Sequence, residues 1–112
     1  MSAVRLTRGD TWQRVWTLKS KVTKQPVPLS GVTARLHVRD NAKALLYAAS
    51  TVNGDIVVDS VAGRLSLTVA ASVTATWTPG NYKFDLELTY PDGTVKTYES
   101  NVLAVLEDQT HG

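Results

Sequence analysis

The feature that most constrains the fold is a strict two-residue alternation of apolar and polar side chains over residues 82–90. The segment reads YKFDLELTY, with five apolar residues alternating with four polar ones. This period is typical of an antiparallel strand with one buried face and one solvated face, and it does not fit a helix. The tetrapeptide PDGT at 91–94 follows directly, and its proline and glycine predict a turn. The sequence therefore predicts a C-terminal hairpin.

Short alternating segments separated by turn residues recur along the whole chain. Strands are predicted near residues 3–6, 12–18, 32–39, 44–48, 56–58, 64–69, 81–90 and 94–106, with one helical turn at 70–75. No long helices alternate with the strands, which excludes parallel α/β folds. We expect an all-β protein, an antiparallel Ig-like β-sandwich of seven or eight strands with one short helical turn. The 112 residues suffice for a single domain, 1–112, with its core at about 3–106 and a frayed tail at 107–112.

The segment 12–18 is the least regular of the predicted strands. Trp12, Trp16 and Leu18 share one face of an extended chain, and Arg14 interrupts that face. Either the inner face carries one polar residue, or a β-bulge shifts the alternation midway. We favour the bulge.

Residue types and spacings argue against catalysis. The absence of cysteine removes disulfides, thiolate zinc sites and thiol nucleophiles, and the histidines, His37 and His111, belong to no metal-binding spacing. No nucleophile or phosphate-loop motif occurs, and no apolar run is long enough to span a membrane. We therefore expect a protein that is not an enzyme, with no catalytic residues, no metal site and no cofactor.

Two short motifs have both a functional and a structural interpretation. Asp85 and Glu87 lie two residues apart, hence on one face of a strand, which is compatible with acid–base chemistry. They occupy the polar face of the most regular strand, however, where solubility accounts for them. The tripeptide Arg8-Gly9-Asp10 is one that some integrins recognise on exposed loops, but its place between two strands favours a structural turn.

Charge is distributed unevenly along the chain. Residues 1–46 contain nine basic residues against two acidic ones, a net charge of +7, whereas the remainder carries −5. Either the two halves form ion pairs within one fold, or they give a dipolar surface that docks on other subunits. Pairing within the fold is favoured. The basic residues lack an interleaved nucleic-acid recognition signature, so no nucleic-acid partner is expected.

Two groups of residues are candidates for an interaction surface. Arg35, His37 and Arg39 form a basic stripe on the solvent face of one predicted strand. Trp12 and Trp16 are predicted core residues, and Trp77, next to Thr78-Pro79-Gly80, is predicted to plug one end of the sandwich; the alternative for all three is an exposed aromatic platform that would stack on sugar rings.

Four motifs in consistent order resemble a known family. They are RGDT at 8–11, PLSGVTARLHVR at 28–39, AGRL at 62–65 and PGNYKFDL at 79–86. This order resembles small Ig-like β-sandwich domains of tailed bacteriophages and prophages, of the kind found at the N-terminus of phage upper baseplate proteins. No functional residues transfer from the family, because the matching motifs are typical of turns and core.

The resemblance implies a non-enzymatic structural protein of a phage or prophage virion, in the baseplate, tail, head–tail junction or capsid surface. Its expected partners are other phage structural proteins, with several copies or a homo-oligomer in one assembly and no membrane partner. Its expected location is the virion, after synthesis in the cytoplasm of the bacterial host. Strand-edge pairing and charge complementarity would provide the contacts. The alternative is a carbohydrate- or receptor-binding β-sandwich module.

Overall fold

A computed structural model describes residues 3–20, 22–25 and 27–107 of the protein. This part of the chain forms eight strands and one short helix: β1 (Val4–Thr7), β2 (Trp12–Thr17), β3 (Thr33–Arg39), β4 (Leu45–Ser50), β5 (Ile56–Asp59), β6 (Arg64–Val69), α1 (Ala71–Thr74), β7 (Gly80–Thr89) and β8 (Val95–Leu106). Each lies within two residues of its predicted position, so the all-β class is confirmed. The predicted frayed tail, with His111, lies outside the described residues except for Glu107.

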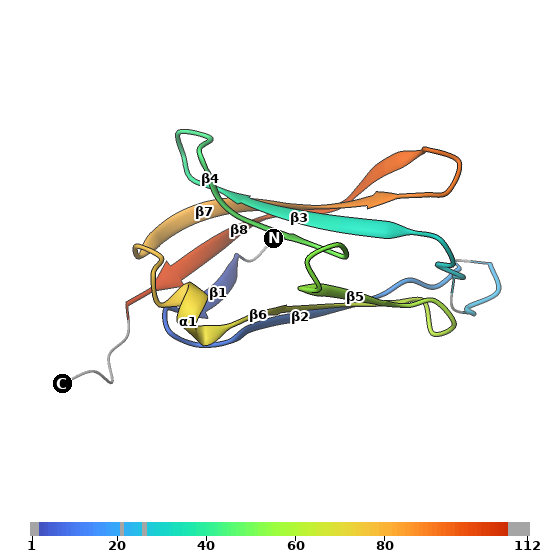
Figure 1. The fold of residues 1–112 in the computed structure, drawn as a ribbon, viewed down its shortest axis with the longest axis horizontal. Helices are drawn as coiled ribbons and strands as arrows, with labels where there is room; N and C mark the ends of the chain where they lie inside the picture. The colour runs from blue at the N-terminus through green and yellow to red at the C-terminus, as the bar shows by residue number, and fades with distance from the viewer. Residues whose placement is uncertain (1–2, 21, 26, 108–112) are drawn as a thin grey trace.

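The strands form two layers, which Figure 1 shows edge-on. The larger sheet has the order β1-β8-β7-β3-β4, and the smaller sheet has the order β2-β6-β5. Neighbouring strands are antiparallel except β1 and β8, which pair in parallel with Val4 opposite Leu103. The predicted antiparallel sandwich is therefore confirmed, with one parallel pairing at this edge. After β1 the chain crosses to the other layer, so β1 pairs with the last strand instead of forming a hairpin with β2.

The core lies between the two layers and follows the alternation of the strands. On β7 the side chains of Tyr82, Phe84, Leu86 and Leu88 are buried, whereas the residues between them face outward. Burial of one face of each sheet against the other supplies the main driving force for folding.

The strand β2 contains no bulge, so that prediction is wrong. Its pairing with β6 runs without a shift from Trp12 opposite Val69 to Trp16 opposite Leu65. Arg14 therefore faces inward, and the interface between the layers accommodates it. A bulge does occur in β8, where Leu86 is opposite Glu99 and Glu87 is opposite Thr97.

The tripeptide 8–10 forms a turn between β1 and β2, as its structural interpretation predicts. The amide of Asp10 donates to the Thr7 carbonyl oxygen at 3.0 Å, and Gly9 has a φ of +88°, which glycine adopts without strain. The buried hydroxyl of Thr74 in α1 accepts from the Gly9 amide at 3.1 Å and donates to the Asp10 carbonyl oxygen at 2.7 Å. These bonds attach the helical turn to one end of the sandwich.

Candidate functional site: the outer face of the larger sheet

The outer face of the larger sheet carries the predicted basic stripe. Arg35, His37 and Arg39 all point outward from β3, because every second residue of a strand faces the same side. Their neighbours across the ladder on β7 are, in the same order, Glu87, Asp85 and Lys83. The stripe thus lies against a strand from the acidic half of the chain.

The first of these cross-strand pairs is an ion pair. The Nη2 atom of Arg35 lies 2.8 Å from Oε1 of Glu87, and its Nε donates to the same oxygen at 2.9 Å. The two side chains remain 58% and 30% exposed, respectively. One member of the basic stripe is therefore already neutralised by a neighbouring strand.

A second ion pair connects the two layers. Nη2 of Arg14 on β2 lies 3.1 Å from Oε1 of Glu99 on β8, and the indole Nε1 of Trp16 donates to that oxygen at 2.9 Å. The guanidinium of Arg14 lies 5.2 Å from the centre of the Trp16 ring and 5.6 Å from that of Phe84, which is a cation–π geometry. Both ion pairs join the basic half of the chain to the acidic half. The predicted pairing of the two halves is therefore confirmed for these two pairs, one within a sheet and one between the sheets.

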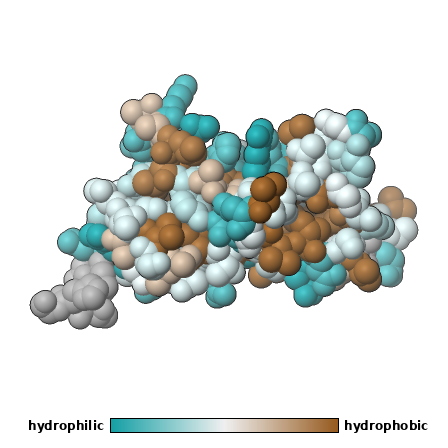
Figure 2. All heavy atoms as spheres, in the orientation of Figure 1, coloured by the Kyte–Doolittle hydropathy of each residue, from teal (hydrophilic) through white to brown (hydrophobic). Residues whose placement is uncertain are grey.

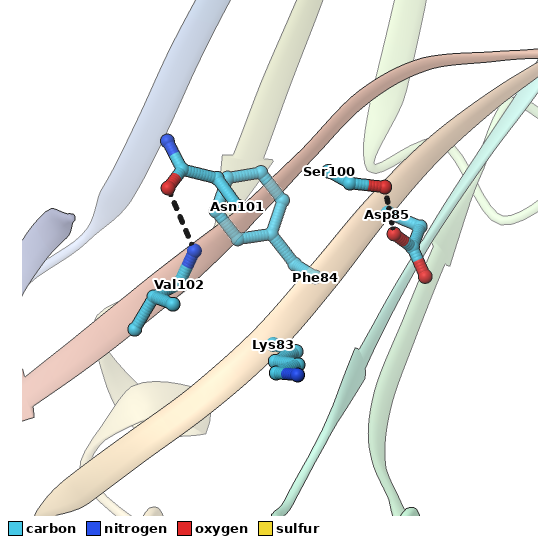
Figure 3. A pocket seen from close by; sticks show the side chains of 6 residues that line it. All are labelled: Lys83, Phe84, Asp85, Ser100, Asn101 and Val102. Atoms are coloured by element: carbon cyan, nitrogen blue, oxygen red, sulfur yellow. Dashed lines mark hydrogen bonds between the residues drawn. The ribbon is translucent and has the colours of Figure 1, made fainter. Parts of the chain in front are cut away.

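The second cross-strand row brings together a histidine, a carboxylate and a serine. His37 is opposite Asp85, and Asp85 is opposite Ser100 on β8. The Ser100 hydroxyl donates a hydrogen bond to Asp85, as Figure 3 shows. His37 and Ser100 lie on opposite sides of the central strand, about 10 Å apart at ordinary strand spacing. His37 is therefore too far away to take the proton of Ser100, and the row does not form an activated nucleophile.

The third row places two cations opposite each other. Arg39 is directly opposite Lys83 in the β3–β7 ladder. In the part of the chain that the structure describes, neither residue takes part in an ion pair. Nη1 of Arg39 donates only to the carbonyl oxygen of Lys43, at 3.2 Å, in the turn after β3. This end of the face thus carries uncompensated positive charge.

Hollows on the surface adjoin these rows. One of about 160 Å³ is lined by Arg35, His37, Arg39, Asp85 and Glu87. A second, of about 380 Å³, shares Asp85 with the first and is lined by Lys83, Phe84, Asp85, Ser100, Asn101 and Val102 (Figure 3). Within the described ranges, no group of three His, Asp or Glu side chains could hold a metal ion, and no helix is long and apolar enough to cross a membrane.

The three tryptophans do not form a surface platform. Trp12, Trp16 and Trp77 are only 3%, 6% and 2% exposed. Trp12 packs edge-to-face against Trp77, with ring centres 6.2 Å apart, and against Phe84, at 5.6 Å. Rings buried in this way cannot stack on a sugar. The aromatic-platform alternative is therefore wrong, and the prediction that these residues belong to the core is confirmed.

The side chain of Asn53 partly covers the edge of β4, a role that the sequence does not predict. The side-chain Nδ2 of Asn53 donates to the carbonyl oxygen of Ala48 at 3.2 Å, and its Oδ1 accepts from the backbone amide of Ser50 at 3.1 Å. The carboxamide therefore occupies backbone groups that a further strand would need. An asparagine shortly after a strand, followed here by Gly54, is a turn signal, but nothing in the sequence shows that its side chain folds back on the strand.

A partly buried contact also fixes β4 against the loop that follows it. The Tyr47 hydroxyl donates to the carboxylate of Asp55. Burial, together with this hydrogen bond and the negative charge of Asp55, raises the pKa of Tyr47 to about 12. Its ring also packs 5.8 Å from that of Trp77, so the phenol belongs to the polar margin of the core.

Hydrophobic residues are visible between the two layers, to the right in Figure 2. In this region β4 has ended, and the short strand β5 does not cover the whole margin of the core.

On the outer face of the smaller sheet, Val15 and Val57 are 59% and 61% exposed, with Ser66 opposite both in the ladder. The two outer faces therefore differ: the larger sheet carries several rows of charged residues, whereas the strands of the smaller sheet present only Arg64 and Asp59, opposite each other at one end.

Comparison with known proteins identifies structures of similar fold but assigns the chain to no family. No protein-family model matches the sequence, and no curated protein resembles it significantly. Several solved structures share its fold, among them the following two. The N-terminal domain of phage TP901-1 ORF48 matches with a TM-score of 0.55 and 13% identity, over 96% of this chain and 86% of that one. CopC from Methylosinus trichosporium OB3b matches with a TM-score of 0.53 and 12% identity, over 99% of this chain and 91% of that one.

Proposed function

We propose that this chain is a non-enzymatic structural protein of a phage or prophage particle, in the baseplate, tail, head–tail junction or capsid surface, where it fixes virion components to each other. The observation that carries the proposal is the fold shared with the N-terminal domain of phage TP901-1 ORF48 over 96% of the chain. The ordered motifs of the sequence support the same assignment. The similarity to CopC has comparable strength, and both similarities concern the fold alone, so the ordered motifs are what favour the phage assignment.

The chemistry of the outer face fits adhesion better than catalysis. Charged residues stand in fixed cross-strand rows on a rigid sheet, and a rigid scaffold lowers the entropy cost of docking. Complementary charges on a partner would orient the contact and speed its formation. Among the described residues, the Ser100 hydroxyl donates to Asp85, and His37 lies two strands away from it, so this row does not form a serine–histidine pair.

Strand edges contribute less to assembly in this proposal than the faces do. Asn53 covers part of the β4 edge. On the opposite side of the sandwich, Arg14 and Glu99 point inward from β2 and β8, and inward-pointing charges discourage a foreign strand from pairing. Faces are therefore the surfaces that we expect virion partners to contact.

The proposal is tested on purified particles. Particles from a host that carries the gene are separated on a density gradient, and the chain is quantified by mass spectrometry relative to the major capsid and tail proteins. We expect a constant ratio across the particle peak, and particles that lack an attached component when the gene is deleted. Normal, infectious particles that do not contain the chain would contradict the proposal.

A further inference from the structure

We propose that the end of the outer face formed by Arg39 and Lys83 is the docking surface of this protein, and that its partner is a protein segment presenting two closely spaced carboxylates. The inference deepens the proposed function and rests on it. It also narrows the predicted basic stripe to Arg39, because among the described residues Arg35 forms an ion pair and Arg39 does not.

The cross-strand register carries the inference. Arg39 on β3 and Lys83 on β7 are direct neighbours, and opposite residues in such a ladder have Cβ atoms about 5 Å apart. Two strands further along the outer face, Arg5 on β1 is opposite Ala104 and adds a third cation to the same end. Among the described residues, none of these cations takes part in an ion pair.

This arrangement costs stability in the free protein. Like charges placed directly opposite each other destabilise a pair of strands, whereas the register two rows away places Arg35 against Glu87. A partner carboxylate between Arg39 and Lys83 would remove the repulsion and add charge-assisted hydrogen bonds. The exposed position of Lys83 leaves its ammonium accessible to such a partner.

The neighbouring acids favour a protein segment over nucleic acid. Asp85 and Glu87 follow Lys83 at two-residue intervals on the same face of β7, and Asp85 borders both hollows. Successive outward residues of a strand are about 7 Å apart. A phosphate backbone that runs along β7 past Lys83 would therefore come close to the carboxylate of Asp85 and be repelled by it. A protein segment whose carboxylates lie only at Arg39 and Lys83 would not.

The test uses the full chain and a capped synthetic peptide, GESEG, whose two glutamates point to the same side when the peptide is extended. Binding is followed by amide chemical shifts in two-dimensional NMR at low salt, with GQSQG as the matched uncharged peptide. We expect saturable shifts for GESEG concentrated at residues 37–43 and 81–85, and none for GQSQG.

Two double variants separate a local site from net charge. Arg39→Gln/Lys83→Gln should raise the dissociation constant for GESEG at least fivefold. Arg64→Gln/Lys96→Gln removes the same charge elsewhere, so it should change the constant less than twofold. Equal losses in both variants, or shifts spread over the whole surface, would overturn the inference.

Two further outcomes are informative. If a 12-base-pair DNA duplex shifts the same amides and GESEG does not, the surface is a nucleic-acid site and the inference is wrong. If particles contain the chain but Arg39→Gln/Lys83→Gln assembles with normal yield, the inference fails while the proposed function stands. If the chain is absent from particles but GESEG binds as expected, the proposed function fails and the carboxylate-binding surface remains.

Discussion

The two ion pairs in the described part of the chain have the same chemistry but lie in different surroundings. Arg35–Glu87 lies on the outer face of one sheet, with side chains 58% and 30% exposed, whereas Arg14–Glu99 joins the two layers, with side chains 23% and 20% exposed. Water screens the first pair and competes for its hydrogen bonds, so such pairs contribute about 0–1 kcal/mol. The second is shielded by aromatic rings and shares its carboxylate with Trp16. Removing one partner there leaves polar groups without compensation.

The inter-layer pair also occupies a vulnerable place in the fold. The strand β2 is an edge of the smaller sheet, and β1 covers β8 only at residues 103–106. Arg14 and Glu99 therefore point inward from two edges that would otherwise be open to other strands. This comparison indicates that the pair between the layers serves both stability and solubility, whereas the pair on the face serves mainly to neutralise charge.

The largest expected effect comes from breaking the inter-layer pair on one side. Glu99→Ala should lower the free energy of unfolding by about 2–3 kcal/mol, because Arg14 and the Trp16 indole lose their shared acceptor in a partly buried site. The measurement is the urea midpoint followed by tryptophan fluorescence. Glu87→Ala is the matched control and should cost less than about 1 kcal/mol. Equal losses in the two variants would contradict the comparison.

Replacing both partners by apolar residues should recover most of that loss. Arg14→Leu/Glu99→Leu is expected to lie about 1 kcal/mol below the wild type, because no unpaired charge remains between the layers but the Trp16 indole still lacks its acceptor. The variant also loses both inward-pointing charges, so light scattering should show more self-association than for the wild type. A monodisperse variant would show that the Arg14–Glu99 pair does not protect the strand edges from association and contributes to the stability of the fold only.

Tyr47 provides an intermediate case between the two ion pairs, since its hydroxyl is partly buried and bonded to Asp55. The folded pKa of Tyr47, about 12, exceeds its ordinary value of 10.0, so its contribution is fully present below pH 10 and is lost as the pH rises towards 12. Tyr47→Phe should cost about 1 kcal/mol at pH 8. The urea midpoint should also fall less steeply between pH 8, 10 and 11 in the variant than in the wild type. Parallel pH profiles of the two proteins would contradict the raised pKa of Tyr47.

The smallest expected effect belongs to the exposed pair. Arg35→Ala should change the free energy of unfolding by less than about 0.5 kcal/mol, and the change should shrink further at 1 M salt because the pair is screened. Denaturation midpoints at low and high salt check both statements. A loss as large as that of Glu99→Ala would show that exposure does not separate the two pairs.

Alternation was sufficient to predict the elements because each strand has one buried and one solvated face. Residues 82–90 keep the two-residue period without exception, and the observed β7 (Gly80–Thr89) matches the predicted strand closely. The prediction failed where an inner position carries a charge. Arg14 breaks the pattern of β2, and its acceptor, Glu99, lies 85 residues away, so no local feature could distinguish a bulge from an inward arginine.

The amino-acid sequence by itself determined the class of the fold, the positions of its strands and the burial of its tryptophans, because these follow from local periodicity and from the cost of exposing large apolar side chains. Only the tertiary structure decided which charges are neutralised. Whether Arg35, Arg39 or Arg14 meets an acid depends on strand order and register, which bring distant residues within a few ångströms of each other. For that reason the uncompensated end of the basic stripe, the proposed docking surface, follows only from the pairing of β3 with β7.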